Sequence, residues 1–189
     1  MLRLKEELLG CLRQRSSSKE LIYKGFYGYC MAVVCRYVTD RSDCEELVND
    51  VFVKVFRNVS QFACPADSDT ANKAFKGWIA RISSRTAIDF LRSKKTYLYI
   101  DDIREAEQPQ TYIAILDKLS VNDILGLLHS LPEMHRLIFN MYEIEGYSHE
   151  EISDLLKIPA SSSRVYLTRA KQKLRELYSK TLVQSYAVK

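Results

Sequence analysis

The chain has 189 residues, of which 47% are hydrophobic and 28% are charged, and its formal net charge is +4. This composition is typical of one ordinary globular domain or two small ones, and it excludes an intrinsically disordered chain. No apolar run approaches the roughly 20 residues of a membrane span, and the N-terminus lacks the apolar middle of a signal peptide. We therefore expect a cytoplasmic protein without direct membrane insertion.

Glycine and proline are rare, with six and four residues, and alternating β-branched runs are few. This pattern predicts an all-α fold, with two small helical bundles joined by an acidic linker and a helix-turn-helix at the end of the second bundle. We assign residues 17–95 to the first bundle, 96–121 to the linker and 122–180 to the second bundle. We expect residues 1–16 to form an N-terminal extension with a frayed or loosely docked helix, and residues 181–189 to form a C-terminal tail.

Residues that commonly carry catalysis or bind metals are sparse. The five cysteines are odd in number and show no C-x-x-C spacing, so we predict free thiols packed as small apolar residues, with a redox sensor as the minor alternative. There is no phosphate-binding glycine loop, no G-x-S-x-G elbow and no zinc-spaced set of Cys and His. The run from His149 begins like H-E-x-x-H, but Ser153 stands at the second histidine position. The sequence therefore predicts no catalytic residue, no metal site and no cofactor.

Charge is unevenly distributed along the chain. Residues 76–95 contain six basic residues and one acidic residue, and residues 157–180 contain seven and one. Between these blocks, residues 101–123 contain six acidic residues and two basic ones. Two basic blocks separated by an acidic one indicate two nucleic-acid contacts and a tether.

Ser-x-x-Glu patterns predict several helix starts, because the two side chains can satisfy free backbone N–H groups reciprocally. The pairs are Ser17 and Glu20, Ser42 and Glu45, Ser130 and Glu133, and Ser148 and Glu151. They predict helices from residue 17 to about 37, from 43 to 58, from about 133 to 145 and from 150 to 157. Gly146 is placed to end the third of these helices, and the turn-rich stretch 61–73 predicts a loop.

The predicted helix at residues 43–58 has a polar, mainly acidic face opposite its apolar one. This face holds Glu46, Asn49, Asp50, Val53 and Arg57. An apolar Val53 within a polar stripe is slightly costly unless something covers it, which hints at a partner surface. Single exposed apolar residues are common, and on Val53 alone the ordinary solvated face is the favoured interpretation.

The stretch from Phe75 to Lys95 predicts one helix with a buried stripe and a basic stripe. On a helical wheel, Arg81, Arg85, Arg92 and Lys95 fall in a single arc that also contains Trp78. Basic side chains around an aromatic ring suit a phosphate backbone whose bases can stack on the ring. An ordinary solvated basic face is the alternative for this helix considered alone.

A short capped helix, a turn at residues 157–159 and a long basic helix at about 160–179 predict a helix-turn-helix. The long helix has a core stripe of Ser163, Leu167, Ala170, Leu174 and Leu177. One exposed face is predicted to hold Ser162, Tyr166, Arg169 and Lys173, and another Arg164, Thr168, Lys171 and Arg175. Such side chains can contact phosphates or base edges. An ordinary pair of angled helices is the alternative.

Taken together, these motifs resemble the extracytoplasmic-function group of bacterial sigma factors, from about Leu21 to Tyr178. Residues 43–58 are similar to the family's acidic helix that docks on the clamp helices of the polymerase β′ subunit. Residues 75–95 are similar to its minus-ten reader, and residues 131–177 to its minus-thirty-five domain. The resemblance implies a sigma factor that binds core RNA polymerase and directs promoter-specific transcription initiation. A stand-alone helix-turn-helix transcriptional regulator is the alternative.

The resemblance also implies roles for particular residues. Core polymerase would meet Glu46, Asn49, Asp50 and Val53. The minus-ten element would meet Trp78, Arg81, Ser84, Arg85, Arg92 and Lys95, with the loop at 61–73 helping to melt it and hold an extruded base. The minus-thirty-five element would meet Ser161, Ser162, Arg164, Val165, Tyr166, Arg169 and Lys173. The implied partners are the β′ clamp helices and β flap of core polymerase, promoter DNA and an anti-sigma factor.

The chain departs from the family pattern at three places. Ser84-Arg85 stands where the family usually has Arg-Asn, which indicates a changed minus-ten preference. Lys157 stands at the turn glycine, and a positive φ there would cost about 1 kcal/mol or somewhat more. Residues 162–166 replace a Thr-Val-Lys-Ser-Arg run, which indicates altered minus-thirty-five contacts.

Overall fold

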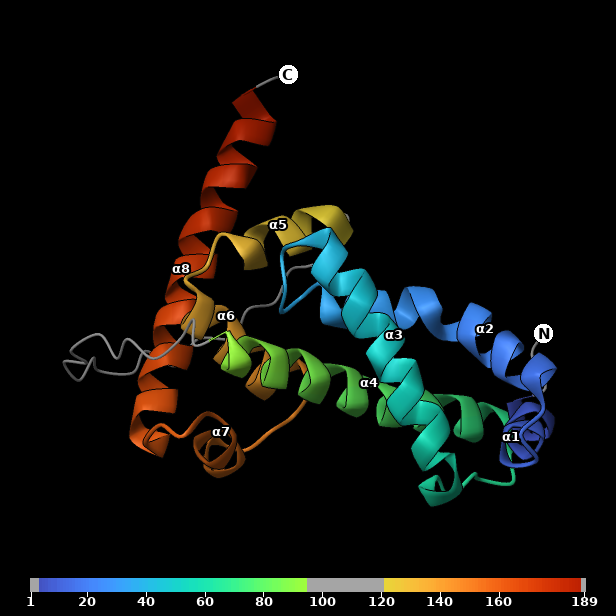
Figure 1. Cartoon of the computed structure of the whole chain (residues 1–189). Coiled ribbons are helices and arrows are strands. Elements are labelled where there is room, and N and C mark those ends of the chain that lie inside the picture. The colour runs from blue at the N-terminus through green and yellow to red at the C-terminus, as the bar shows by residue number, and fades with distance from the viewer. Residues whose placement is uncertain (1–3, 95–120, 188–189) are drawn as a thin grey trace. The chain divides into compact units, whose positions relative to one another are not determined.

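The structure, a computed structural model of the whole chain, describes residues 4–94 and 121–187, with side chains described at 4–94 and 123–179. Within these ranges the secondary structure is entirely helical (Figure 1), which confirms the all-α fold. The chain divides into two compact units, residues 1–90 and 91–189. The acidic linker predicted at 96–121 falls outside the described residues, apart from its last residue, where the first helix of the second unit begins.

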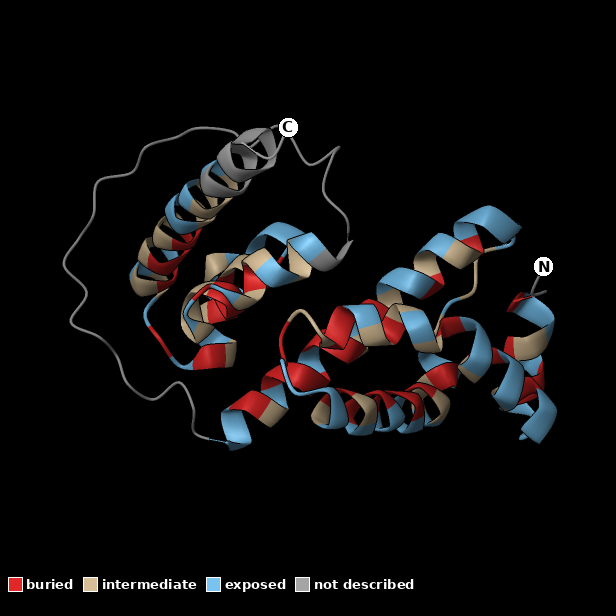
Figure 2. Cartoon of the chain, turned by 90° about the horizontal axis from the view of Figure 1, so that it is seen from above, coloured by how far each residue is buried: buried red, intermediate tan, exposed pale blue. Residues whose placement is uncertain are grey.

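The first unit is built from α1 (Leu4–Leu12), α2 (Ser16–Val34), α3 (Arg41–Asn58), the short η1 (Val59–Gln61) and most of α4 (Ser68–Ser93). Its core contains the apolar stripes expected from the helical spacing, and Figure 2 shows these buried positions along the helices. The stripe of α2 is represented by Ile22 and Phe26, and that of α3 by Val48 and Val51. The ring of Phe26 packs edge-on against Phe75 of α4 at a centroid distance of 5.0 Å, and the ring of Tyr23 in α2 lies 4.6 Å from Phe52 of α3, so all three long helices share one core.

The N-terminal helix α1 is docked rather than frayed, and the expectation of a loosely held segment is wrong. Leu4, Leu8 and Cys11, spaced at one helical stripe, are 3%, 5% and 1% exposed. This stripe packs against α2 and η1. Gly10 allows the close approach, because a Cβ added there would collide with the side chain of Ser18 in α2.

The helix starts in the first unit differ from the predicted capping boxes. Ser17 and Ser42 lie inside α2 and α3, where a side chain can no longer cap the helix. The start of α3 is capped by Asp40, whose carboxylate accepts from the Asp43 backbone N–H at 2.9 Å. Glu20 instead pairs with Lys24 one turn along α2. A carboxylate two residues earlier therefore replaces the predicted serine at the start of α3.

Helix α4 begins earlier than predicted, so the loop expected at 61–73 is reduced to residues 62–67 between η1 and α4. The carboxylate of Asp67 accepts from the Thr70 backbone N–H at 2.8 Å, as an N-cap residue does. This hydrogen bond lowers the pKa of Asp67 below its ordinary value. Asp67 thus starts the helix about two turns before Phe75.

The second unit contains α5 (Val121–His129), α6 (Glu133–Phe139), the π-helical η2 (Asn140–Ile144), α7 (His149–Leu156) and α8 (Ala160–Ala187). Helix α8 packs against α5, α6 and α7. Leu128, Leu131 and Ala170 form a buried cluster between these elements. Helix α8 continues to Ala187, so the segment predicted as a C-terminal tail is helical for most of its length.

Two predicted helix boundaries in the second unit have opposite outcomes. The predicted box of Ser130 and Glu133 is wrong, because the Ser130 hydroxyl donates to the Gly126 carbonyl at 2.8 Å and Pro132 precedes α6 without a side-chain cap. The end at Gly146 is confirmed, since this residue adopts φ 77° directly after the helical segment.

The five cysteines, all in the described part of the chain, are free thiols. Burial raises the pKa of Cys30 to about 11 and that of Cys44 to about 12. Both thiols are therefore protonated at neutral pH, which disfavours a redox role for them.

Among the described residues, no group of three or more His, Cys, Asp or Glu side chains could hold a metal ion. Each described helix is either too short or too polar to span a lipid bilayer.

Candidate functional site

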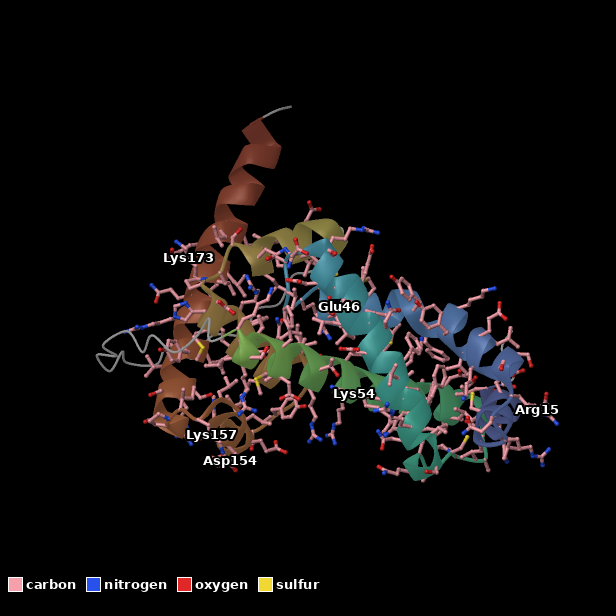
Figure 3. The ribbon with its side chains drawn as sticks, viewed as in Figure 1. Arg15, Glu46, Lys54, Asp154, Lys157 and Lys173 are labelled. Atoms are coloured by element: carbon pink, nitrogen blue, oxygen red, sulfur yellow. The ribbon has the colours of Figure 1, made fainter. Side chains whose placement is uncertain are left out.

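The polar face of α3 is exposed along its whole length. Glu46, Asn49, Asp50 and Val53 are all solvent-exposed, and Val53 has 47% of its surface accessible. Their spacing of three, one and three residues places them on one side of the helix, and Figure 3 labels Glu46 on α3. The structure thus brings together all four residues predicted for this face, which are two carboxylates, one amide and an apolar side chain.

Within the described residues, side-chain hydrogen bonds join α3 to both α2 and α4. The Tyr23 hydroxyl of α2 donates to Asn49 Oδ1 at 2.9 Å. The Lys54 ammonium donates to the Thr86 hydroxyl of α4 at 3.0 Å. Neither bond is visible from a helical wheel, because each joins residues that are more than 25 positions apart in the chain.

The basic face of α4 is also largely as predicted. Arg81, Arg85 and Arg92 are exposed, whereas Lys95 lies outside the described residues. Trp78 is half-buried, and its ring centroid lies 5.4 Å from Phe62 and 5.7 Å from Phe75. Phe62 opens the loop at 62–67, so the indole is held between this loop and the helix core. The face therefore presents arginines beside a ring of fixed position.

Ser84 does not belong to this exposed face, so its predicted role as a DNA contact lacks the exposure that the role needs. Its side chain is 0% exposed, and its hydroxyl donates to the Arg81 carbonyl at 3.2 Å. Ser83, Thr86 and Ala87 beside it are buried as well. Because these side chains are small, α4 can pack closely at this point. The close packing buries Ser84, which a helical wheel places near the boundary between the buried and exposed faces.

The predicted helix-turn-helix is present in the second unit. Its first helix, α7, opens with a complete capping box: the Glu151 N–H donates to Ser148 Oγ at 3.1 Å, and the Ser148 N–H donates to Glu151 Oε2 at 2.8 Å. Lys157 ends α7 in the left-handed region at φ 58° and ψ 40°. The Ser153 hydroxyl donates to the Ile158 carbonyl at 2.7 Å and closes the turn.

Most predicted contact residues of α8 are accessible. Ser161, Arg164 and Lys173 are exposed, and Ser162, Val165 and Arg169 are half-buried. Figure 3 labels Lys157 at the turn and Lys173 along α8. Tyr166, also predicted as a DNA contact, is the exception, because it is 5% exposed and its ring meets His135 of α6 edge-on at 5.4 Å. Packing of α6 along α8 widens the buried stripe beyond the narrow one predicted.

Ion pairs connect the basic residues of α8 to earlier elements. Arg164 lies 3.0 Å from Glu150 of α7, and Lys171 lies 2.7 Å from Glu143 of η2. Surface pairs of this kind contribute little to stability, about 0–1 kcal/mol. A phosphate group can replace such a carboxylate as the partner of Arg164, so this pair is compatible with DNA binding.

His149 is a structural residue that sequence reasoning missed. Its ring stacks on Tyr142 of η2 at a centroid distance of 4.4 Å, and its Nδ1 lies 2.9 Å from the Ser163 hydroxyl. Burial, followed by the nearby Arg164, lowers the pKa of His149. The sequence did contain a signal for this role. His149 directly follows the capping Ser148, so it had to lie in the first turn of α7.

Comparisons with known proteins cover both units. The family model described as Sigma-70 region 2 matches residues 22–97, and the model described as Sigma-70, region 4 matches residues 122–174. The chain is 28% identical over 147 residues to the ECF RNA polymerase sigma factor SigE of Mycolicibacterium smegmatis, covering 75% of this chain and 54% of that protein. It is 22% identical over 166 residues to the ECF RNA polymerase sigma-E factor of Haemophilus influenzae, covering 80% and 82%.

Two further matches are a curated relative and a solved structure. The RNA polymerase sigma factor SigZ of Bacillus subtilis is 27% identical over 144 residues, covering 75% of this chain and 78% of SigZ. Among solved structures, CnrH in complex with the cytosolic domain of CnrY matches 92% of this chain and 96% of that chain, at 18% identity and a TM-score of 0.45.

Proposed function

This chain belongs to the extracytoplasmic-function sigma factors of bacterial RNA polymerase, the subunits that recognise promoters, and we propose how its two units share that task. The first unit binds core polymerase through α3 and the minus-ten element through α4. The second unit binds the minus-thirty-five element through α8. The chain supplies no catalytic residue of its own and acts as a specificity subunit.

The observation that carries the proposal is the exposed face of α3. Glu46 and Asp50 place two carboxylates on the same face as Val53, which is 47% exposed although it is apolar. A basic partner surface with an apolar spot complements this arrangement, because charge directs the encounter and the buried apolar contact adds affinity. We propose the clamp helices of the β′ subunit as this surface.

For the minus-ten element, the supporting feature is the arginine face of α4. Exposed Arg81, Arg85 and Arg92 can neutralise phosphates and release counterions, which gives salt-dependent binding. The half-buried Trp78 offers a ring on which an unpaired base can stack. Lys95 remains a predicted member of this surface.

For the minus-thirty-five element, the supporting feature is the exposed side of α8 after the turn at Lys157. Arg164, Arg169 and Lys173 can contact phosphates or guanine edges, and the hydroxyls of Ser161 and Ser162 can contact either. Ser84 and Tyr166, which are buried, are left out of the proposed DNA contacts. The β flap of core polymerase is the proposed protein partner of the second unit.

Restraint by an anti-sigma factor is a separate proposal that rests on the family resemblance alone. Co-purification of the tagged chain from its native host, followed by identification of partners by mass spectrometry, tests it. Recovery of core polymerase without any second, stoichiometric partner under non-inducing conditions would contradict it.

Run-off transcription with purified core polymerase tests the function. We expect promoter-specific transcripts with the parent chain and weaker core binding when Asp50→Ala is combined with Val53→Glu. Leu12→Glu is the matched control, because Leu12 of α1 is 46% exposed and lies outside the proposed face. Unchanged core affinity of the double variant would remove α3 as the docking face. Tight binding to a duplex operator without polymerase would instead indicate a stand-alone regulator.

A further inference from the structure

A hydrogen bond from the neighbouring helix α2 fixes one side chain of the exposed α3 face. Asn49 is exposed, and its Oδ1 accepts a hydrogen bond from the Tyr23 hydroxyl of α2 at 2.9 Å. An exposed asparagine side chain would otherwise sample several rotamers in water. A hydrogen bond from a second helix restricts it to one of them.

The Tyr23 side chain is itself fixed by packing. Its ring lies 4.6 Å from the Phe52 ring of α3 and 5.3 Å from the Tyr27 ring of α2, both in tilted geometry. Phe52 is 2% exposed and belongs to the core shared by these helices. Packing therefore fixes the orientation of the Tyr23 ring. The position of its hydroxyl in turn determines the position of the Asn49 amide.

This hydrogen bond decides what Asn49 offers to a partner. An asparagine amide has one acceptor oxygen and one donor NH₂ group. Because Oδ1 already accepts from Tyr23 and keeps one lone pair, the NH₂ group with its two hydrogens is the larger part of the hydrogen-bonding capacity left to the amide. Ionised Glu46 and Asp50 can only accept hydrogen bonds, so the face presents one donor beside two carboxylates.

We infer that Tyr23 is a positioning residue for core polymerase binding, and that the polymerase presents a hydrogen-bond acceptor, a carbonyl or carboxylate oxygen, to Asn49. Cationic groups of the polymerase then face Glu46 and Asp50. The inference rests on the proposed function in one respect, namely that α3 is the docking face.

The first test measures the affinity of full-length variants for purified core polymerase. Tyr23→Phe removes only the hydroxyl, and we expect core binding to weaken by about three- to tenfold, the range of one hydrogen bond. The thermal unfolding temperature should stay close to that of the parent, because the packed ring is kept. Tyr27→Phe is the matched control and should bind core as the parent does. Parent-like affinity of Tyr23→Phe would overturn the positioning role.

A second variant tests the donor. Asn49→Asp keeps an oxygen for Tyr23 but replaces the NH₂ donor by another acceptor. We expect at least a tenfold loss of core affinity, since two acceptors would then face each other. If the partner offered only positive charge at this point, the added carboxylate would leave binding unchanged or tighten it, and that result would overturn the inference.

A double-mutant cycle separates positioning from independent effects. In the Asn49→Ala background, Tyr23→Phe should cause no further loss of core affinity, because the group it positions is gone. Additive losses would overturn the inference.

The results can also contradict the Tyr23 inference without contradicting the proposal that α3 is the docking face. If Asp50→Ala with Val53→Glu weakens core binding while Tyr23→Phe and Asn49→Asp do not, α3 stays the docking face and only this inference fails.

Discussion

The Nδ1 atom of His149, the first residue of α7, lies 2.9 Å from the hydroxyl of Ser163 in the first turn of α8. Ser163 is 0% exposed, so this contact lies beneath the surface that α8 presents. The same imidazole stacks on Tyr142 of η2 at 4.4 Å. The His149 side chain of α7 therefore contacts both η2 and α8, and it helps to fix the orientation of α8 relative to α7.

This arrangement predicts a pH-dependent stability of the second unit. Burial lowers the pKa of His149 below its ordinary value of 6.5, with Arg164 and Lys171 acting in the same direction and Glu150 against it. The unfolded chain then binds the proton more readily than the folded one, so the free energy of unfolding is highest above about pH 6.5 and decreases as pH falls below it.

Thermal unfolding between pH 7.5 and 5 measures this effect. We expect His149→Gln to show a flatter dependence of the unfolding temperature on pH than the parent. His129→Gln is the control, because His129 of α5 lies outside this contact, and it should retain the parent slope. An unchanged slope for His149→Gln would assign the pH dependence to other groups.

The Asp40 cap of α3 predicts a difference between two neighbouring residues. Asp40→Ala removes the acceptor of the Asp43 N–H and should lower the free energy of unfolding by about 1 kcal/mol. Ser42→Ala, at an exposed helical position, should change it by less than about 0.5 kcal/mol. Urea unfolding measures both. A larger loss for Ser42→Ala than for Asp40→Ala would contradict the assigned cap.

The burial of Tyr166 predicts a structural role. Tyr166→Ala should destabilise the second unit by about 3–5 kcal/mol, as the loss of other buried aromatic rings does. Tyr166→Phe keeps the ring beside His135 and should leave binding to a minus-thirty-five duplex by the polymerase holoenzyme nearly unchanged. By contrast, Arg169→Ala should weaken that binding. Footprinting of a promoter with each holoenzyme compares them, and a selective loss with Tyr166→Phe would restore tyrosine as a DNA contact.

The left-handed conformation of Lys157 predicts a stabilising substitution. A side chain at φ 58° costs about 1–2 kcal/mol, part of which Lys157→Gly recovers after the entropy cost of glycine. We expect a net gain of about 0.5–1 kcal/mol in the free energy of unfolding. Lys157→Ala keeps the steric cost and should show no such gain. Equal stability of the two variants would show that no strain is relieved at this turn.

Several features of this protein were predictable from the sequence because they depend on neighbouring residues alone. Apolar spacing of three and four residues identified the helices and most of their buried positions, such as Ile22 and Val51. The Ser148 box and the Gly146 end were correct, since each needs only a few consecutive residues. The exposed face of α3, with Val53, follows from the same periodicity.

Other features depended on which element lies against which. Ser84 and Tyr166 sit at the edges of their apolar stripes, and only the packing of small residues around α4 and of α6 along α8 decided that both are buried. The docking of α1 required the meeting of Gly10 with Ser18, and the Tyr23–Asn49 bond required α2 beside α3. Local periodicity states which face of a helix is apolar. The neighbouring element determines how much of that face is buried. It also determines which polar groups on the face form hydrogen bonds across the contact.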